Sequence, residues 1–80
     1  MAGARAVSAL AEGLDELDAD EVCVLAGEVV TRAYRTFDPD AAKIDAAHGR
    51  LWARTRGQGT LSPSDPDVAI IVAAALAVGP

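Results

Sequence analysis

The side chains that could act as a nucleophile or a general base are scarce in this sequence. Of its 80 residues, one is a cysteine and one is a histidine, Cys23 and His48. Acyl transfer needs a nucleophile, a base and a third group that orients the base, whereas these two residues fall on different predicted helices. Both lie on or beside an apolar helix face, so we expect both to be structural and the protein not to be an enzyme.

Metal ligands are equally scarce. A thiolate zinc cluster needs several cysteines, and a single histidine would need carboxylates converging on it, but the chain has one residue of each kind. The acidic stretch 15–21 lacks the glycine that a calcium-binding loop needs for its sharp turn. We therefore expect no catalytic residue, no metal site and no cofactor.

Two acids of that stretch, Asp15 and Glu16, are not explained by a helix start. They fall near the end of a predicted helix, where the helix dipole disfavours anions. They are a candidate contact for a basic partner, and a solvated surface is the alternative.

A basic corner is the second candidate for binding. The stretch 46–64 contains no acidic residue, and it holds Arg50, Trp52, Arg54 and Arg56. Arginines, an aromatic ring and the exposed backbone of the following glycines could bind phosphate or a nucleic-acid backbone. The alternative is that the cations complement the negative end of a helix and the glycines end it. We take these four residues as candidate partner-binding residues.

The last predicted helix, 66–78, is apolar nearly all round, so it must be buried on most sides. Its large side chains form one side: Val68, Ile71, Val72 and Leu76. Its small side chains form the other and permit close backbone approach: Ala69, Ala73 and Ala77. We expect this helix either to be the centre of the bundle or to turn its alanine side toward another chain, which makes the three alanines candidate self-association residues.

Three Asp-x-Asp patterns, at 18–20, 38–40 and 65–67, each precede a helical apolar pattern. In each, the first Asp can cap a helix, Ala or Pro suits the first helical position, and the second Asp meets the positive end of the dipole. With a 3.6-residue apolar period following each, the patterns predict helices at 19–37, 39–55 and 66–78.

A further helix is predicted at 4–17 from one apolar stripe, and the residues 57–64 read as a loop by composition. A strand over 68–72 is the alternative for the start of the last helix, but the sequence offers it no partner strand. The prediction is a single all-α domain, 1–80, a bundle of four helices with the apolar C-terminal helix central. Its bulky core should come from Val, Leu and Ile, helped by the aromatic side chains.

Charge and hydropathy restrict the partners. The net charge of −5 disfavours nucleic acid and anionic membranes at long range. The longest apolar run, 68–78, covers roughly half of a bilayer core at about 1.5 Å per residue. A helix-turn-helix reader is disfavoured because Asp38, Asp40 and Asp45 would face phosphates.

We therefore expect a cytoplasmic, non-enzymatic protein–protein interaction or assembly module, which forms a homo-oligomer or docks on a larger protein partner. The alternative function is a nucleic-acid- or phosphate-binding accessory protein that uses the basic corner at 50–56.

Overall fold

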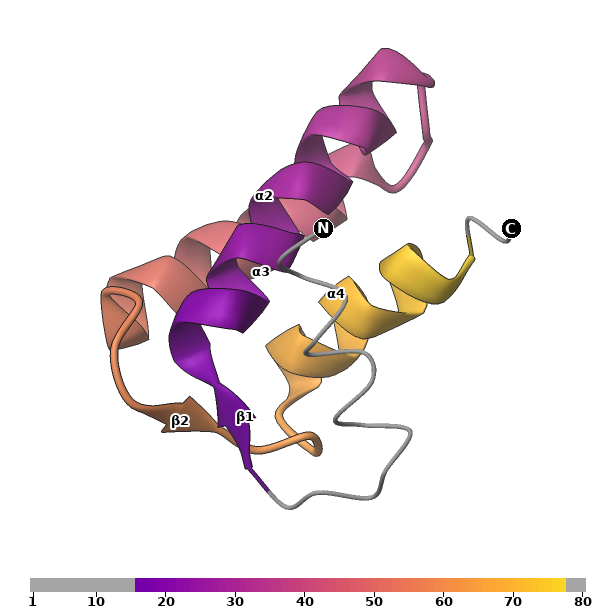
Figure 1. The fold of residues 1–80 in the computed structure, drawn as a ribbon. Coiled ribbons are helices and arrows are strands. Elements are labelled where there is room, and N and C mark those ends of the chain that lie inside the picture. The colour runs from indigo at the N-terminus through magenta and orange to yellow at the C-terminus, as the bar shows by residue number, and fades with distance from the viewer. Residues whose placement is uncertain (1–15, 78–80) are drawn as a thin grey trace.

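The structure, a computed structural model, describes residues 16–77. Along the chain its elements are β1 (Leu17–Asp18), α2 (Ala19–Arg35), α3 (Ala41–Thr55), β2 (Thr60–Leu61) and α4 (Pro66–Leu76). Three helices pack together beside a small two-stranded sheet, as Figure 1 shows.

The predicted bundle of four helices is wrong for the part of the chain that the structure describes, which holds three. Most of the predicted helix 4–17 lies outside the described residues. Its last residue, Leu17, is not helical but belongs to β1.

The start of α2 follows the capping prediction. The Asp18 carboxylate accepts hydrogen bonds from the backbone N–H groups of Asp20 at 2.9 Å and Glu21 at 3.4 Å. These are two of the amide groups that the first turn leaves without a helical partner. Asp20 and Glu21 also place negative charge at the positive end of the helix dipole.

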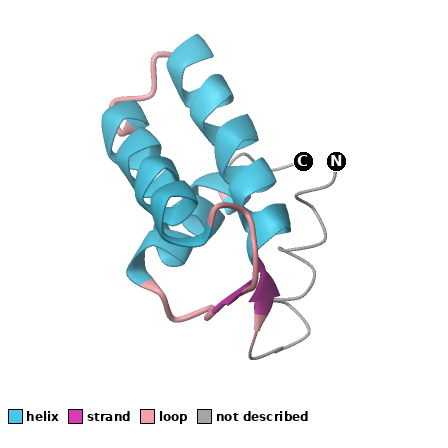
Figure 2. Cartoon of the chain, turned by 90° about the vertical axis from the view of Figure 1, so that its left-hand side faces the viewer, coloured by secondary structure: helices cyan, strands magenta, loops and turns pink. Residues whose placement is uncertain are grey.

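α2 ends at Arg35, two residues before the predicted end, because Phe37 adopts the left-handed conformation with φ 56°. The N–H of Phe37 donates to the carbonyl of Tyr34 at 3.3 Å, and the N–H of Asp38 donates to that of Ala33 at 2.8 Å. This pair of bonds is a Schellman motif, in which glycine is the usual left-handed residue. A bulky residue there costs roughly 1–2 kcal/mol. The resulting turn joins α2 to α3 in Figure 2.

α3 begins at Ala41 rather than at the predicted Pro39. The Asp38 carboxylate accepts from the N–H of Asp40 at 2.8 Å, which closes a turn over 38–40 before the helix starts. Asp40 then occupies the capping position without a side-chain hydrogen bond.

The end of α3 at Thr55 matches the prediction. Arg56 takes the first left-handed position, with φ 54°, and its N–H donates to the carbonyl of Trp52 at 2.8 Å. Gly57 follows with φ 73°, a conformation that glycine adopts without steric strain.

The predicted loop 57–64 contains a strand, so the all-α prediction is corrected to a mostly helical domain. β1 and β2 pair antiparallel, with Leu17 opposite Leu61 and Asp18 opposite Thr60. Both leucines are buried, so the pairing closes the core at the base of the helices. The two strands are drawn in magenta in Figure 2.

α4 starts as predicted, and the strand alternative for 68–72 is wrong. The Asp65 carboxylate accepts from the N–H groups of Asp67 at 2.9 Å and Val68 at 3.4 Å, with Pro66 in the first turn. α4 ends at Leu76, and the last residue of the predicted span, 78, lies outside the described residues.

Among the three described helices, α4 does not take the predicted central position. α2 and α3 form a hairpin, and α4 packs against one side of it and stops short of the turn between them (Figure 1). Within the described residues, α4 buries Val68 and Ile71 fully, while Ala69, Ala73 and Leu76 are exposed. The largest side chains that are fully buried come from four elements: Leu17, Val22, Leu51, Val68 and Ile71.

The aromatic side chains do not help to fill this core, contrary to expectation. Tyr34 is 51% exposed, Phe37 91% and Trp52 48%. The core is instead aliphatic and alanine-rich, which lets the helix backbones approach closely.

Candidate functional site

The start of α4 is held by an arginine of α3. Arg54 donates through Nη1 to Asp65 Oδ2 at 2.9 Å and through Nη2 to Asp65 Oδ1 at 3.2 Å. This two-pronged geometry matches the planar guanidinium to the planar carboxylate. The Asp65 side chain is only 16% exposed, and Arg54 holds the pKa of that carboxyl below its usual 3.8. Arg54 therefore fixes the residue that caps α4.

Arg50, one turn earlier in α3, anchors the first turn of α4 by binding Asp67. Arg50 donates through Nε at 3.0 Å and Nη2 at 2.8 Å to Asp67 Oδ1, and Arg54 reaches Asp67 Oδ2 at 3.3 Å. The hydrogen bonding of Arg50 to the Asp67 carboxylate raises the pKa of Arg50. Two arginines and two aspartates thus form one ion-pair network between α3 and α4.

The structure therefore divides the four residues of the predicted basic corner. Arg50 and Arg54 face α4 and are neutralised by its carboxylates. Trp52 instead lines a groove against α2, and Arg56 is exposed at the end of α3. The carboxylate partners lie 11 to 17 residues along the chain from the arginines, beyond the reach of a local spacing argument.

The candidate self-association residues lie together. Ala69, Ala73 and Ala77 line one groove of about 400 Å³ between α4 and the start of α3, which we call the alanine groove. Ile70 and Ala74 of the same helix also line it, and α3 with the turn before it supplies the rest: Asp38, Asp40, Lys43 and Ile44. All three alanines are exposed, and Leu76 on the same helix is 62% exposed. The groove has an apolar floor and a rim that carries both signs of charge.

A smaller hollow of about 230 Å³ adjoins the alanine groove where α4 ends before it reaches the turn between α2 and α3. The two share Asp38, Ile44, Ala74 and Ala77. Arg32 of α2 lines the smaller hollow and donates through Nη2 to the carbonyl of Ala74 at 3.3 Å. A cation there complements the negative end of the α4 dipole.

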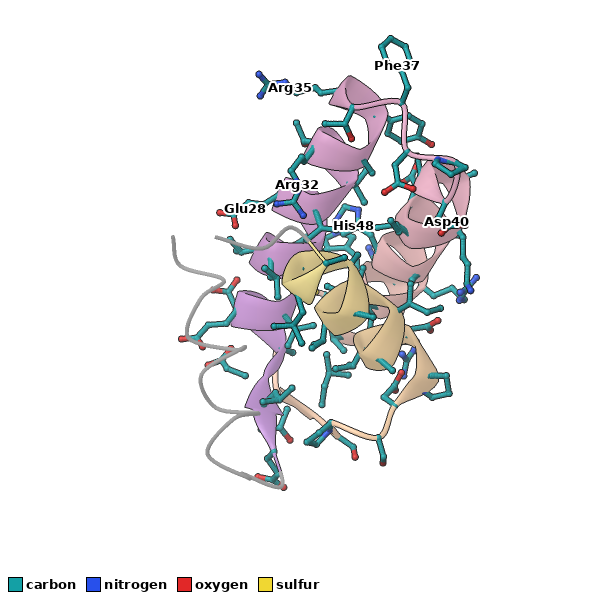
Figure 3. All side chains as sticks on the ribbon, turned by 90° about the vertical axis from the view of Figure 1, so that its right-hand side faces the viewer. Glu28, Arg32, Arg35, Phe37, Asp40 and His48 are labelled. Atoms are coloured by element: carbon teal, nitrogen blue, oxygen red, sulfur yellow. The ribbon has the colours of Figure 1, made fainter. Side chains whose placement is uncertain are left out.

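Phe37 is a surface feature that the sequence pattern missed, because it falls on the apolar period of the predicted helix 19–37. Its ring projects from the turn at the end of the hairpin in Figure 3 and is 91% exposed. An aromatic in a left-handed position gains nothing from the turn itself. The residue is therefore unexplained by the fold.

Cys23 and His48, the two side chains with the clearest chemical potential, come from α2 and α3 and line one groove between these helices. Cys23 is 4% exposed, and its Sγ lies 3.7 Å from Thr55 Oγ1. His48 is half-buried between α2 and α3 (Figure 3). In residues 16–77, no three His, Cys, Asp or Glu side chains are grouped so that they could hold a metal ion.

None of the three described helices is long and apolar enough to cross a bilayer. Comparison of the chain with models of known protein families, with curated proteins and with solved structures finds no match. The function must therefore be argued from the surfaces themselves.

Proposed function

We propose that this protein is a small helical assembly module that pairs with a second copy of itself through the outer face of α4. The observation that carries the proposal is the exposure of an apolar helix face over a groove lined by Ala69, Ala73 and Ala77. Small side chains let another helix approach closely, and burial of Leu76 and its neighbours would supply the hydrophobic driving force.

The choice of a second copy as partner rests on the neighbourhood of this groove. Phe37, a projecting apolar side chain, directly precedes Asp38, which lines the groove. A surface that carries both a knob and a groove can pair with itself about a two-fold axis, each ring entering the other copy's groove. The rim supports the same pairing, because Lys43 of one copy can meet Asp38 and Asp40 of the other.

The test is the mass of the protein in solution. Sedimentation equilibrium should give twice the chain mass of 8.2 kDa for the wild type. Ala73→Glu should give a monomer, because it would bury an unpaired carboxylate in the interface. Ala53→Glu makes the same change at an exposed alanine of α3 that lines neither groove nor hollow, and it should leave the dimer intact. A wild type that stays monomeric at high concentration overturns the proposal.

A further inference from the structure

A second groove lies between α2 and α3 and has no α4 residue in its lining. It measures about 360 Å³ and is lined by Asp20, Cys23, Val24, His48, Gly49 and Trp52. We call it the Trp52 groove. Val24 is 39% exposed and Trp52 48%, so two apolar side chains of this groove face solvent. The surface is separate from the alanine groove on which the proposed function rests.

A carboxylate lies beside the indole ring. The position that a Cβ would occupy at Gly57 lies 3.0 Å from Trp52 Cζ3 and 3.6 Å from Asp20 Oδ1. The carboxylate and the ring edge therefore flank the same small space. The backbone N–H of Asp20 is bonded to Asp18, but its carboxylate has no hydrogen-bond or ion-pair partner among the described residues. A negative charge and an electron-rich ring thus lie side by side.

We infer that the Trp52 groove binds the guanidinium of an arginine side chain in a basic partner peptide, stacked on Trp52 and paired with Asp20. A planar guanidinium can lie on the indole face while its N–H groups donate to the carboxylate. The aliphatic part of the arginine and an adjacent apolar side chain then cover Val24. Asp20 supplies the charge and Trp52 the stacking surface.

The surroundings of Trp52 favour a cationic ligand over the anionic one that the sequence offered as an alternative. Arg50 and Arg54, which would have drawn phosphate toward this helix, are paired with Asp67 of α4 and with Asp65, which caps α4. Asp20 lies beside the ring, in a chain of net charge −5. A phosphate would therefore meet a like charge in this groove.

The experiment uses Trp52 as its own reporter, because it is the single tryptophan of the chain. The wild type is titrated with the peptide acetyl-Leu-Arg-Ala-Leu-Arg-amide, and the emission of Trp52 is followed. We expect a saturable change that weakens with salt. The matched peptide with citrulline in place of arginine keeps the shape and loses the charge, and it should bind at least about fivefold more weakly.

Variants assign the binding to the two residues. Asp20→Asn should lower the affinity for the arginine peptide about threefold to fivefold. The control Asp45→Asn removes one charge from an exposed residue of α3 that lines none of these grooves, keeps an acceptor for the Tyr34 hydroxyl, and should leave binding unchanged. Trp52→Leu, followed by calorimetry, keeps an apolar side chain and removes the ring, and it should lower the affinity by a similar factor.

Three results would overturn the inference: equal binding of the arginine and citrulline peptides, unchanged binding by Asp20→Asn, or an emission change with a short oligothymidylate and none with the peptide. Repeating the titration on Ala73→Glu separates this site from the proposed function. Peptide binding should persist in that variant whether or not the wild type is a dimer.

Discussion

The guanidinium of Arg54 holds both carboxylate oxygens of Asp65, at 2.9 and 3.2 Å, while the same carboxylate caps the first turn of α4. One side chain therefore serves two elements: it satisfies the free amides of one helix and anchors that helix to another. The sequence showed the cap but not the anchor, and each has its own measurable consequence.

Replacing Arg54 and replacing Asp65 should lower the free energy of unfolding by different amounts. Arg54→Ala breaks a half-exposed ion pair, which is worth about 0.2–1 kcal/mol. Asp65→Ala loses that pair and also the cap, which is worth about 1 kcal/mol more. Urea unfolding should therefore rank Asp65→Ala as clearly the more destabilising variant. Equal losses would show that the carboxylate contributes through the ion pair alone.

The same carboxylate should make stability depend on pH. Its pKa in the folded protein lies below 3.8, chiefly because Arg54 donates to the charged form. The stabilisation is thus present above the unfolded pKa and is lost as the pH falls through the lower, folded value. Asp65→Asn keeps a capping side chain and removes the titrating charge. Unfolding free energies measured from neutral pH into acid should converge between wild type and variant below pH 3.8; a constant difference would contradict the assignment.

The parts of this fold that sequence predicts are those set by neighbours along the chain. Asp18 and Asp65 cap the helices they were expected to cap, since a cap needs only the next three residues. The start of α3 was predicted two residues too early, at Pro39. The Asp38 carboxylate can close a turn or cap a helix, and the local pattern does not decide between them.

What sequence could not predict depends on residues far apart. The β1–β2 pair is two residues long on each side and joins Leu17 to Leu61, with no strand pattern long enough to detect. The local sequence gives Arg50 and Arg54 no visible partner, and the structure pairs them with carboxylates at the start of α4. Ala69, Ala73 and Ala77 do line one groove, because periodicity alone assigns residues to helix faces.

Phe37 offers a test that separates association from stability. Phe37→Gly removes the strain of a bulky left-handed residue and should stabilise the monomer fold by roughly 1 kcal/mol. If the ring is the knob of the proposed dimer, the same change should weaken dimerisation. Phe37→Ala removes the ring but keeps an L side chain in that conformation, so it should weaken the dimer without the gain in stability. Unfolding in urea and sedimentation, measured on both variants, check the two effects separately.

The packing of Trp52 against Gly57 gives the last prediction. A Cβ at Gly57 would lie 3.0 Å from Trp52 Cζ3, and the residue has φ 73°, so Gly57→Ala adds a steric conflict to backbone strain. Gly59 has φ 82° with nothing within 4 Å of an added Cβ, so Gly59→Ala adds the strain alone, about 1–2 kcal/mol. Gly57→Ala should therefore be the more destabilising change in urea, and it alone should shift the emission of Trp52. Displacement of the indole ring by the added methyl group should also disturb its placement beside Asp20. Gly57→Ala should therefore bind the arginine peptide more weakly, whereas Gly59→Ala should bind it as the wild type does. Identical emission and affinity in the two variants would show that Gly57 does not position the ring.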